Sequence, residues 1–280
     1  MDVLDTLNSL QQLSDDEIKR QQEEKRKISK PSFHFDRLKM FFGEDYEIGG
    51  IKISIPTIGE ILNIGEQRYY DAIRPFLNNP TSVRVLLYDT FKKDWNKTKE
   101  IEVFYILLQL VKDKMPLRLI FKDIDFSDFE LICFDKKTDY KIEQTYALIS
   151  KSQQLLINED TYIEIAEYIR CMMNVHPKVE KAKGRTTKLW ILQEDRMKML
   201  RESDKENKSH LLSLVSSCLN HPGFKYTLDE LKNVNICQFM DSVNRIQKYE
   251  QGIAALHGLF GGMIDAKAIP KDTLNFMGEY

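Results

Sequence analysis

The stretch HPGFKYTLDELKNVNICQFMDSVNRI, residues 221–246, carries the most ordered pattern of the chain. His221-Pro222-Gly223 is a stop and turn, because proline cannot continue the helix expected before it. Thr227-Leu228-Asp229-Glu230 has the spacing of a capping box, which starts a short helix. Apolar residues then recur at helical spacing, at Ile236, Phe239, Met240, Val243 and Ile246. The stretch therefore predicts a long amphipathic helix.

This helix is expected to work by packing, because no residue in the stretch belongs to a recognisable catalytic pattern. We interpret Phe239 and Val243 as core residues. The alternative is that part of the apolar stripe grips a helix or strand of a partner protein. The candidate partner-binding residues are aromatic: Phe224, Tyr226, Tyr249 and Trp190.

Outward from this stretch, the N-terminal half predicts strands. From Arg37 the pattern changes to strands, and residues 46–48 and 51–55 alternate about Gly49-Gly50, as in a hairpin. Thr57-Ile58-Gly59-Glu60 is another capping box. It opens a helix that is expected to bury Ile58, Ile61 and Leu62 on one face.

The remaining segments alternate between helical and strand-like patterns. Helices are expected at 84–91, 102–112 and 159–174, and short strands at 117–121, 129–134, 140–144 and 155–157. A charged segment at 178–206 and a more apolar one at 208–220 complete a mainly helical C-terminal half. Strands followed by helices predict the α+β class.

Three regions are predicted: a polar helical arm at 1–33, an α+β domain at 34–175, and a helical region at 176–280 packed on that domain. The arm contains a capping box at Ser14–Glu17. The residues that follow this box carry almost no apolar face, so the arm is expected to be marginal or to depend on a partner.

Composition limits the classes of function. The 280 residues are 42% hydrophobic and 30% charged, with a formal net charge of -2. With this net charge the protein as a whole does not attract nucleic acid or anionic lipid, so neither is an expected partner. No apolar run approaches the roughly 20 residues that span a bilayer. The acidic start MDVLDTLNSL is unlike a signal peptide, and the four dispersed cysteines fit reduced thiols in a cytoplasm.

The sequence contains no strong catalytic or metal-binding motif. The chain lacks the phosphate-binding, metalloprotease and nucleophile-elbow motifs, so we expect no enzyme and no cofactor. Cys218 and His221 have the spacing of one zinc ligand pair, but the second pair is missing. Asp123, Asp125 and Asp128 are close in sequence, as turn aspartates often are. The basic run at 178–188 is interpreted as a solvated helix face, with a nucleic-acid site near Trp190 as the alternative.

Two blocks, FFGEDYEIGGIKISIPTIGEIL and HPGFKYTLDELKNVNICQFMDSVNRIQ, together with the terminal LNFMGE, resemble a protein family. This family is encoded in the tail-morphogenesis regions of long-tailed phages and prophages of low-GC Gram-positive bacteria. The resemblance runs, with gaps, from about Leu38 to Gly278. It implies a role in building the phage tail, similar to that of a tail assembly chaperone, and it carries no functional residues to transfer.

Two hypotheses follow. The first is a non-enzymatic assembly factor that binds the tape-measure or tube protein in the host cytoplasm during virion morphogenesis. The second is a structural subunit of the tail, neck or baseplate that stays in the virion. Self-association remains open in both.

Overall fold

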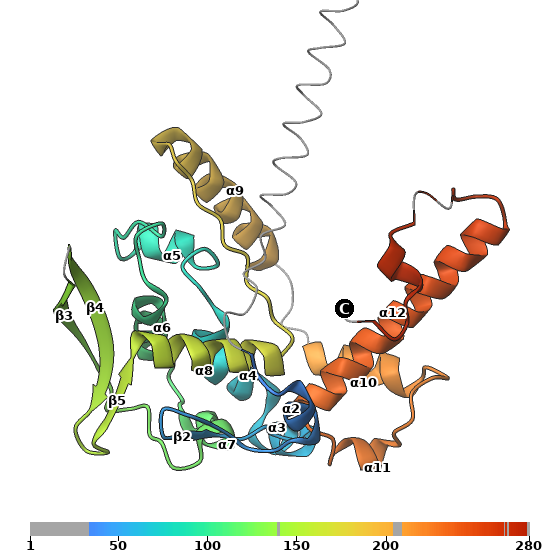
Figure 1. Cartoon of the computed structure of the whole chain (residues 1–280), viewed down its shortest axis with the longest axis horizontal. Helices are drawn as coiled ribbons and strands as arrows, with labels where there is room; N and C mark the ends of the chain where they lie inside the picture. Colours follow the sequence, from blue (N-terminus) through green and yellow to red (C-terminus); the bar gives the residue numbers. More distant parts are fainter. Residues whose placement is uncertain (1–33, 139–140, 204–208, 266, 268, 279–280) are drawn as a thin grey trace, which may run out of the picture.

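The computed structural model describes residues 34–138, 141–203, 209–265, 267 and 269–278 (Figure 1). The arm predicted at 1–33, with its capping box, lies outside these residues. The fold is α+β, as predicted, with short antiparallel strands mostly in the N-terminal half and helices in the C-terminal half.

The elements follow one another in three groups. The first contains α2 (Arg37–Phe42), β1 (Tyr46–Ile48), β2 (Ile51–Ile53), α3 (Ile58–Ile64), α4 (Glu66–Leu77), α5 (Arg84–Asp89) and α6 (Glu100–Leu110). The second contains η1 (Met115–Leu117), α7 (Arg118–Phe121), β3 (Glu130–Thr138), β4 (Lys141–Ser150), β5 (Leu155–Asn158) and α8 (Glu159–Met172). The third contains α9 (Arg185–Ser203), α10 (His210–Leu219), α11 (Leu228–Leu231), α12 (Ile236–Phe260) and η3 (Lys271–Leu274).

Both described sheets are small and antiparallel. In the first, β1 pairs with β2, and the turn uses Gly49 (φ 56°) and Gly50 (φ 80°) as the sequence predicted. In the second, the order is β3-β4-β5, and β3 with β4 forms a ribbon that projects from one edge of the body (Figure 1). The predicted strands in this region were shorter than the observed ones.

The main core lies among α4, α6, α8 and the first half of α12. Rings meet closely there: the centroids of Phe76 and Phe104 are 4.6 Å apart, and those of Phe104 and Tyr162 are 4.8 Å apart. Ile236 and Phe239 of α12 are fully buried in the same core. The domain boundary predicted between residues 175 and 176 stays a prediction, but side chains from both sides of it share this core.

A joint of backbone hydrogen bonds connects the start of α3 to the start of α12. Ile58 N donates to Val234 O (2.9 Å), Gly59 N to Lys232 O (2.8 Å) and Ile236 N to Pro56 O (2.9 Å). Gly59 is required at this close approach, because a Cβ there would lie 2.8 Å from Lys232 O. Asn235 also donates through Nδ2 to Phe41 O (3.0 Å), which attaches α2 to the same point.

Both capping boxes predicted within the described residues are confirmed. Thr57 and Glu60 exchange backbone and side-chain hydrogen bonds at the start of α3, and Thr227 and Glu230 do so at the start of α11. Asn235 and Gln238 form a further capping box at the start of α12, which the sequence analysis missed.

Two strand predictions are wrong. Residues 37–42 form α2, because Asp36 caps its first amides and Gly43 (φ 77°) ends it. Residues 117–121 are helical, and Ile120 O accepts from Ser54 N (2.8 Å) instead of joining a ladder. A short apolar run of this length has no periodicity that separates strand from helix.

Three further expectations need correction. Leu62 was expected on the buried face of α3, but its side chain is 54% exposed. The charged segment at 178–206 was expected to be helical throughout, whereas its helix begins only at Arg185. Helix α4, which supplies Tyr69 and Phe76 to the core, was missed, and Gly65 at its start was the available signal.

A second, smaller core holds α9 against α5 and α6. Leu87, Trp95, Val103 and Leu192 are buried in it. Ion pairs surround this contact: Arg84 binds both carboxylate oxygens of Asp195 (2.5 and 3.0 Å) and Oε2 of Glu180 (2.7 Å). Arg196 with Asp89 and Lys188 with Asp94 form further pairs. Helix α9 is therefore held by a small apolar core with ion pairs around it.

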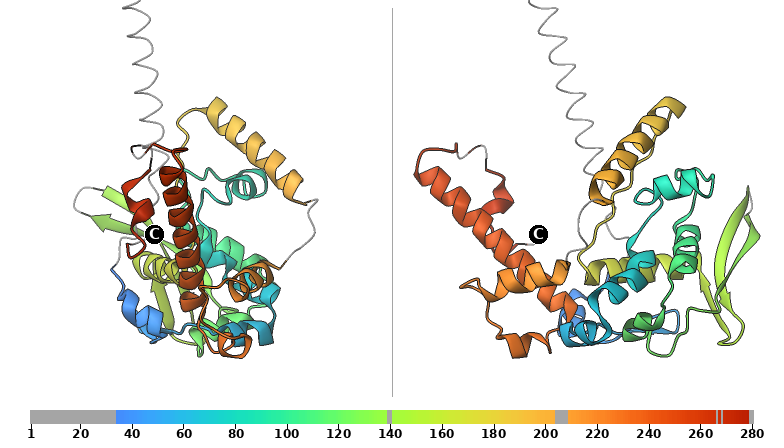
Figure 2. Two further views of the ribbon diagram at one scale, coloured as in Figure 1. Left: turned by 90° about the vertical axis from the view of Figure 1, so that its right-hand side faces the viewer. Right: turned by 180° about the vertical axis from the view of Figure 1, so that it is seen from behind.

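Helix α12 changes its environment along its length. Ile236, Phe239 and Val243 are buried, as predicted, and Met240 and Ile246 are half-buried. Beyond them α12 projects from the body on the same side as α9, with the C-terminal residues folded back along it (Figures 1 and 2).

We predict that Phe239→Ala lowers the free energy of unfolding by about 3–5 kcal/mol, because it empties a fully buried aromatic site. Phe260→Ala on the same helix is the matched control, since Phe260 is 82% exposed. Denaturant unfolding of both variants checks this. Equal stability of the two variants would contradict the assignment of Phe239 to the core.

We predict that Arg84→Met loosens α9 without unfolding the main core. The free energy of local opening of α9 should fall by only about 1 kcal/mol, because the partly exposed carboxylates of Asp195 and Glu180 are hydrated again when Arg84 is removed. Amide exchange in α9 should then accelerate roughly fivefold while exchange in α8 stays unchanged. Arg201→Met on the same helix is the control, and similar exchange in both variants would refute the role of Arg84.

Candidate functional site

The four aromatics predicted to bind a partner lie in three places. Trp190 is on α9 and is 60% exposed. Tyr249 is on α12, 48% exposed, with its ring centroid 5.4 Å from that of Phe276. Phe224 and Tyr226 contact each other edge to face at 5.5 Å and are half-buried against the main core. Phe224 is therefore not the exposed aromatic that the sequence indicated.

The outward side of α9 carries a second apolar face. Trp190, Met197 and Leu200 recur at helical spacing and are 60%, 48% and 61% exposed. Trp190 and Met197 lie on the side of α9 opposite the buried Leu192, which packs on the body, and Leu200 lies between these two sides. We call this surface, made of Leu189, Trp190, Met197 and Leu200, the α9 outer face.

A shallow apolar groove lies between α3, α10 and α11. Its exposed lining includes Leu62, Leu212 and Leu228, and its cavity measures about 140 Å³. Glu66 closes one end, where its carboxylate accepts from the backbone amides of His210 and Leu211 at 2.9 Å. That carboxylate therefore binds the first backbone amides of α10.

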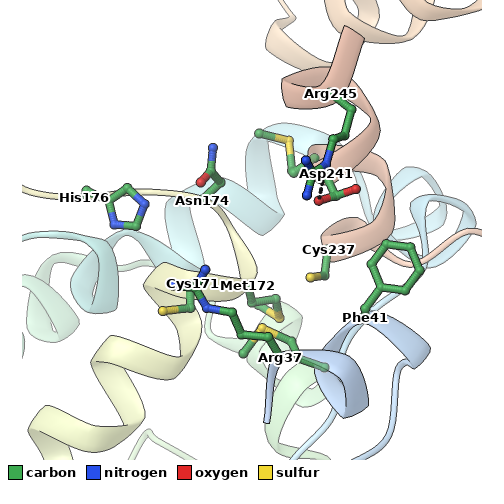
Figure 3. Close-up of a pocket in the computed structure, with 11 residues that line it drawn as sticks. Arg37, Phe41, Cys171, Met172, Asn174, His176, Cys237, Asp241 and Arg245 are labelled. Carbon is green, nitrogen blue, oxygen red and sulfur yellow. Dashed lines mark ion pairs between the residues drawn. The ribbon is translucent and has the colours of Figure 1, made fainter. Parts of the chain in front are cut away.

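A further site lies between the end of α8 and α12, and we call it the α8–α12 groove. Its deeper part is a pocket of about 250 Å³ bounded by α2, α8 and α12 (Figure 3). Its longer, more open part measures about 540 Å³ and runs along α12 toward η3. Asn174 and His176 line both parts, so the two are continuous.

The pocket is rich in sulfur. Five of its eleven lining side chains contain sulfur: Met40, Cys171, Met172, Cys237 and Met240. Such side chains are polarisable and adapt to irregular apolar groups, including aromatic rings. The polar lining comes from Arg37, Asn174, His176, Asp241 and Arg245, and Asp241 forms an ion pair with Arg245 (3.8 Å).

The electrostatics keep the pocket's thiols and imidazole neutral. Burial raises the pKa of Cys171, and burial with the nearby Asp241 carboxylate raises the pKa of Cys237 to about 11. Partial burial and the Arg37 guanidinium lower the pKa of His176. A raised thiol pKa reduces the thiolate that acts as a nucleophile, so this arrangement suits binding rather than covalent chemistry.

The candidate metal ligands are used in other ways. Cys218 is buried, and His221 contacts Glu250 through Nε2 (2.9 Å) and accepts from Gly223 N through Nδ1 (3.0 Å). Asp125 accepts from Ser127 N at 2.9 Å. Asp128 accepts from Ser150 Oγ and from Gln153 Nε2. Within the described ranges, no three His, Cys, Asp or Glu side chains gather around a point where a metal ion could bind.

The basic run at 178–188 serves the fold as well. Lys188 pairs with Asp94 at 2.5 Å and lies 5.5 Å from the centroid of the Trp95 ring. None of the helices in the described part of the chain has the length and apolar character to span a bilayer.

The chain matches no protein-family model, and no curated protein or solved structure shows significant similarity to it. The resemblance to the tail-morphogenesis family thus remains a prediction that rests on the quoted sequence blocks.

We predict that Cys237 reacts with iodoacetamide far more slowly than the exposed Cys133. With its pKa near 11, Cys237 holds roughly one thiolate per thousand molecules at pH 8. Mass spectrometry of peptides from timed labelling of the native protein checks the order, and the denatured protein is the control. Equal native rates at the two positions would contradict the burial of Cys237.

Proposed function

We propose that this chain is a non-enzymatic tail assembly factor that binds a tail component, the tape-measure or the tube protein, during virion morphogenesis in the host cytoplasm. The structural observation that carries the proposal is the α9 outer face. It presents Trp190, Met197 and Leu200 on a helix that already buries its other face on the body.

This surface has the chemistry of a protein-binding site. Tryptophan is enriched among the residues that dominate binding energy, and methionine adapts to partner surfaces of different shape. An amphipathic helix in a partner could pack on these side chains, which lie about two turns and one turn apart along α9. The ion pairs of Arg84 and Arg196 hold α9 in place, so little further ordering of this helix is needed on binding.

The resemblance to tail-morphogenesis proteins supplies the class of partner. An assembly factor of this kind would cover apolar surface on a tail component until that component is assembled. An assembly factor should be absent from the finished particle, whereas a structural subunit should be present in it. This difference separates the two hypotheses.

We predict that the tagged protein captures the tape-measure or tube protein from infected cells and is absent from purified mature particles. Mass spectrometry of both samples checks this. Presence in the particle at a fixed copy number would favour the structural subunit. Failure to capture either tail protein would refute the assembly role.

The surface is tested with Trp190→Glu combined with Leu200→Glu. This variant should lose at least tenfold in captured tail protein while its thermal midpoint stays near that of the wild type. Phe134→Glu, at a 45% exposed position on β3, is the control. Equal capture by both variants would remove the α9 outer face from the proposal.

A further inference from the structure

We propose that the α8–α12 groove binds an extended polypeptide segment, with one large apolar side chain of that segment seated in the sulfur-lined pocket. The occupant is a partner peptide of this chemistry, whichever protein supplies it. The inference therefore goes beyond the tail role and does not depend on it.

The first argument is the shape and length of the site. One face of α12, from Cys237 to Gln251, lines the groove along its whole length. These residues span about 21 Å at the rise of an α-helix. An extended chain covers that distance with about six residues. The pocket of about 250 Å³ lies at one end, where a single anchor side chain would enter.

The second argument is the change of chemistry along the groove. The pocket presents the half-buried Cys171, Cys237 and Met240, with the buried Met40 and Met172 behind them, and this sulfur-rich lining suits an aromatic or aliphatic anchor. The open part instead offers the amide side chains of Asn244, Gln247 and Gln251. An amide group both donates and accepts, as the main chain of an extended peptide requires.

The third argument is an unsatisfied donor. Asn244 Nδ2 is shielded from solvent and has no hydrogen-bond partner within the described part of the chain. A buried donor without an acceptor costs about 1–3 kcal/mol. Asn244 also lines the open part of the groove, and binding would use a rotamer of this side chain that moves Nδ2 out of its buried position toward a peptide carbonyl. Asn174, on the facing wall, has the left-handed φ of 51° that commonly ends a helix, here α8.

The fourth argument is that α12 already holds main-chain carbonyls at the edge of this groove. Arg245 donates through Nη1 to Gly278 O (2.8 Å) and Phe276 O (3.3 Å), and Lys248 donates through Nζ to Gly278 O (3.0 Å). Both side chains also line the groove, Arg245 the pocket and Lys248 the open part. The same helix face thus already binds main-chain carbonyls, here those of the turn at 276–278.

The experiment begins with a library of random twelve-residue peptides displayed on yeast and selected on the purified full-length chain. A selected peptide is then synthesised with a fluorescent label and titrated by anisotropy. We expect the selected peptides to share one large apolar residue. Selection without such a residue would overturn the proposal.

Two substitutions locate the binding. Cys237→Leu fills the pocket, and Asn244→Leu removes the unsatisfied donor. Each substitution should lower the affinity for the labelled peptide at least tenfold, whereas Cys133→Leu on β3 should leave the affinity unchanged. The free Asn244→Leu protein should melt at the same temperature as the wild type or higher, a result that a purely structural role for Asn244 would not give.

Thiol protection gives an independent readout. Bound peptide should slow the alkylation of Cys171 and Cys237 but not that of Cys133. Loss of peptide binding in the Trp190→Glu and Leu200→Glu variant, with Cys237→Leu still binding, would assign the peptide to the α9 outer face and overturn the proposal. Protection of the two thiols by inorganic phosphate without peptide would assign the pocket to an anion and overturn it as well.

Discussion

Three main-chain hydrogen bonds between the residues before α3 and those before α12 hold the architecture together. They fix the starting direction of α12, which then delivers Ile236 and Phe239 into the core built by α4, α6 and α8. Through Asn235 the same joint holds α2, which forms one wall of the α8–α12 groove. The core and the α8–α12 groove both depend on this small region of backbone pairing.

The sequence predicted local structure best where a few neighbouring side chains determine it. Thr57 with Glu60, the Gly49-Gly50 turn and the buried face of α12 are of this kind. The prediction was wrong at residues 117–121, where a five-residue segment with four apolar side chains fits either a strand or a helix and tertiary contacts decide. The α+β class followed from the order of such segments, while the exact ends of β3 and β4 depend on pairing that no local pattern shows.

The candidate site was less predictable, for a physical reason. The α8–α12 groove is lined from α2, α8, α12 and η3, so its residues meet only after the chain has folded. One signal was present: Cys237, Met240, Asp241 and Asn244 recur on a second face of α12, beside the core stripe. Tyr249 was expected to be exposed and is, and Trp190, a partner-binding candidate from the sequence, is also exposed. The sequence did not single out Met197 and Leu200, because apolar residues lie on two sides of α9 and their spacing looks irregular.

The joint also bears on how quickly this protein can fold. Asn235 and Phe41 contact each other across 194 residues of chain. Contacts of such long sequence separation form slowly, because loop closure costs entropy before any contact repays it. During synthesis the first helices must wait until α12 has left the ribosome. Until then the start of α3 lacks its hydrogen-bond partners at 232–236, and the incomplete fold exposes apolar surface that favours aggregation.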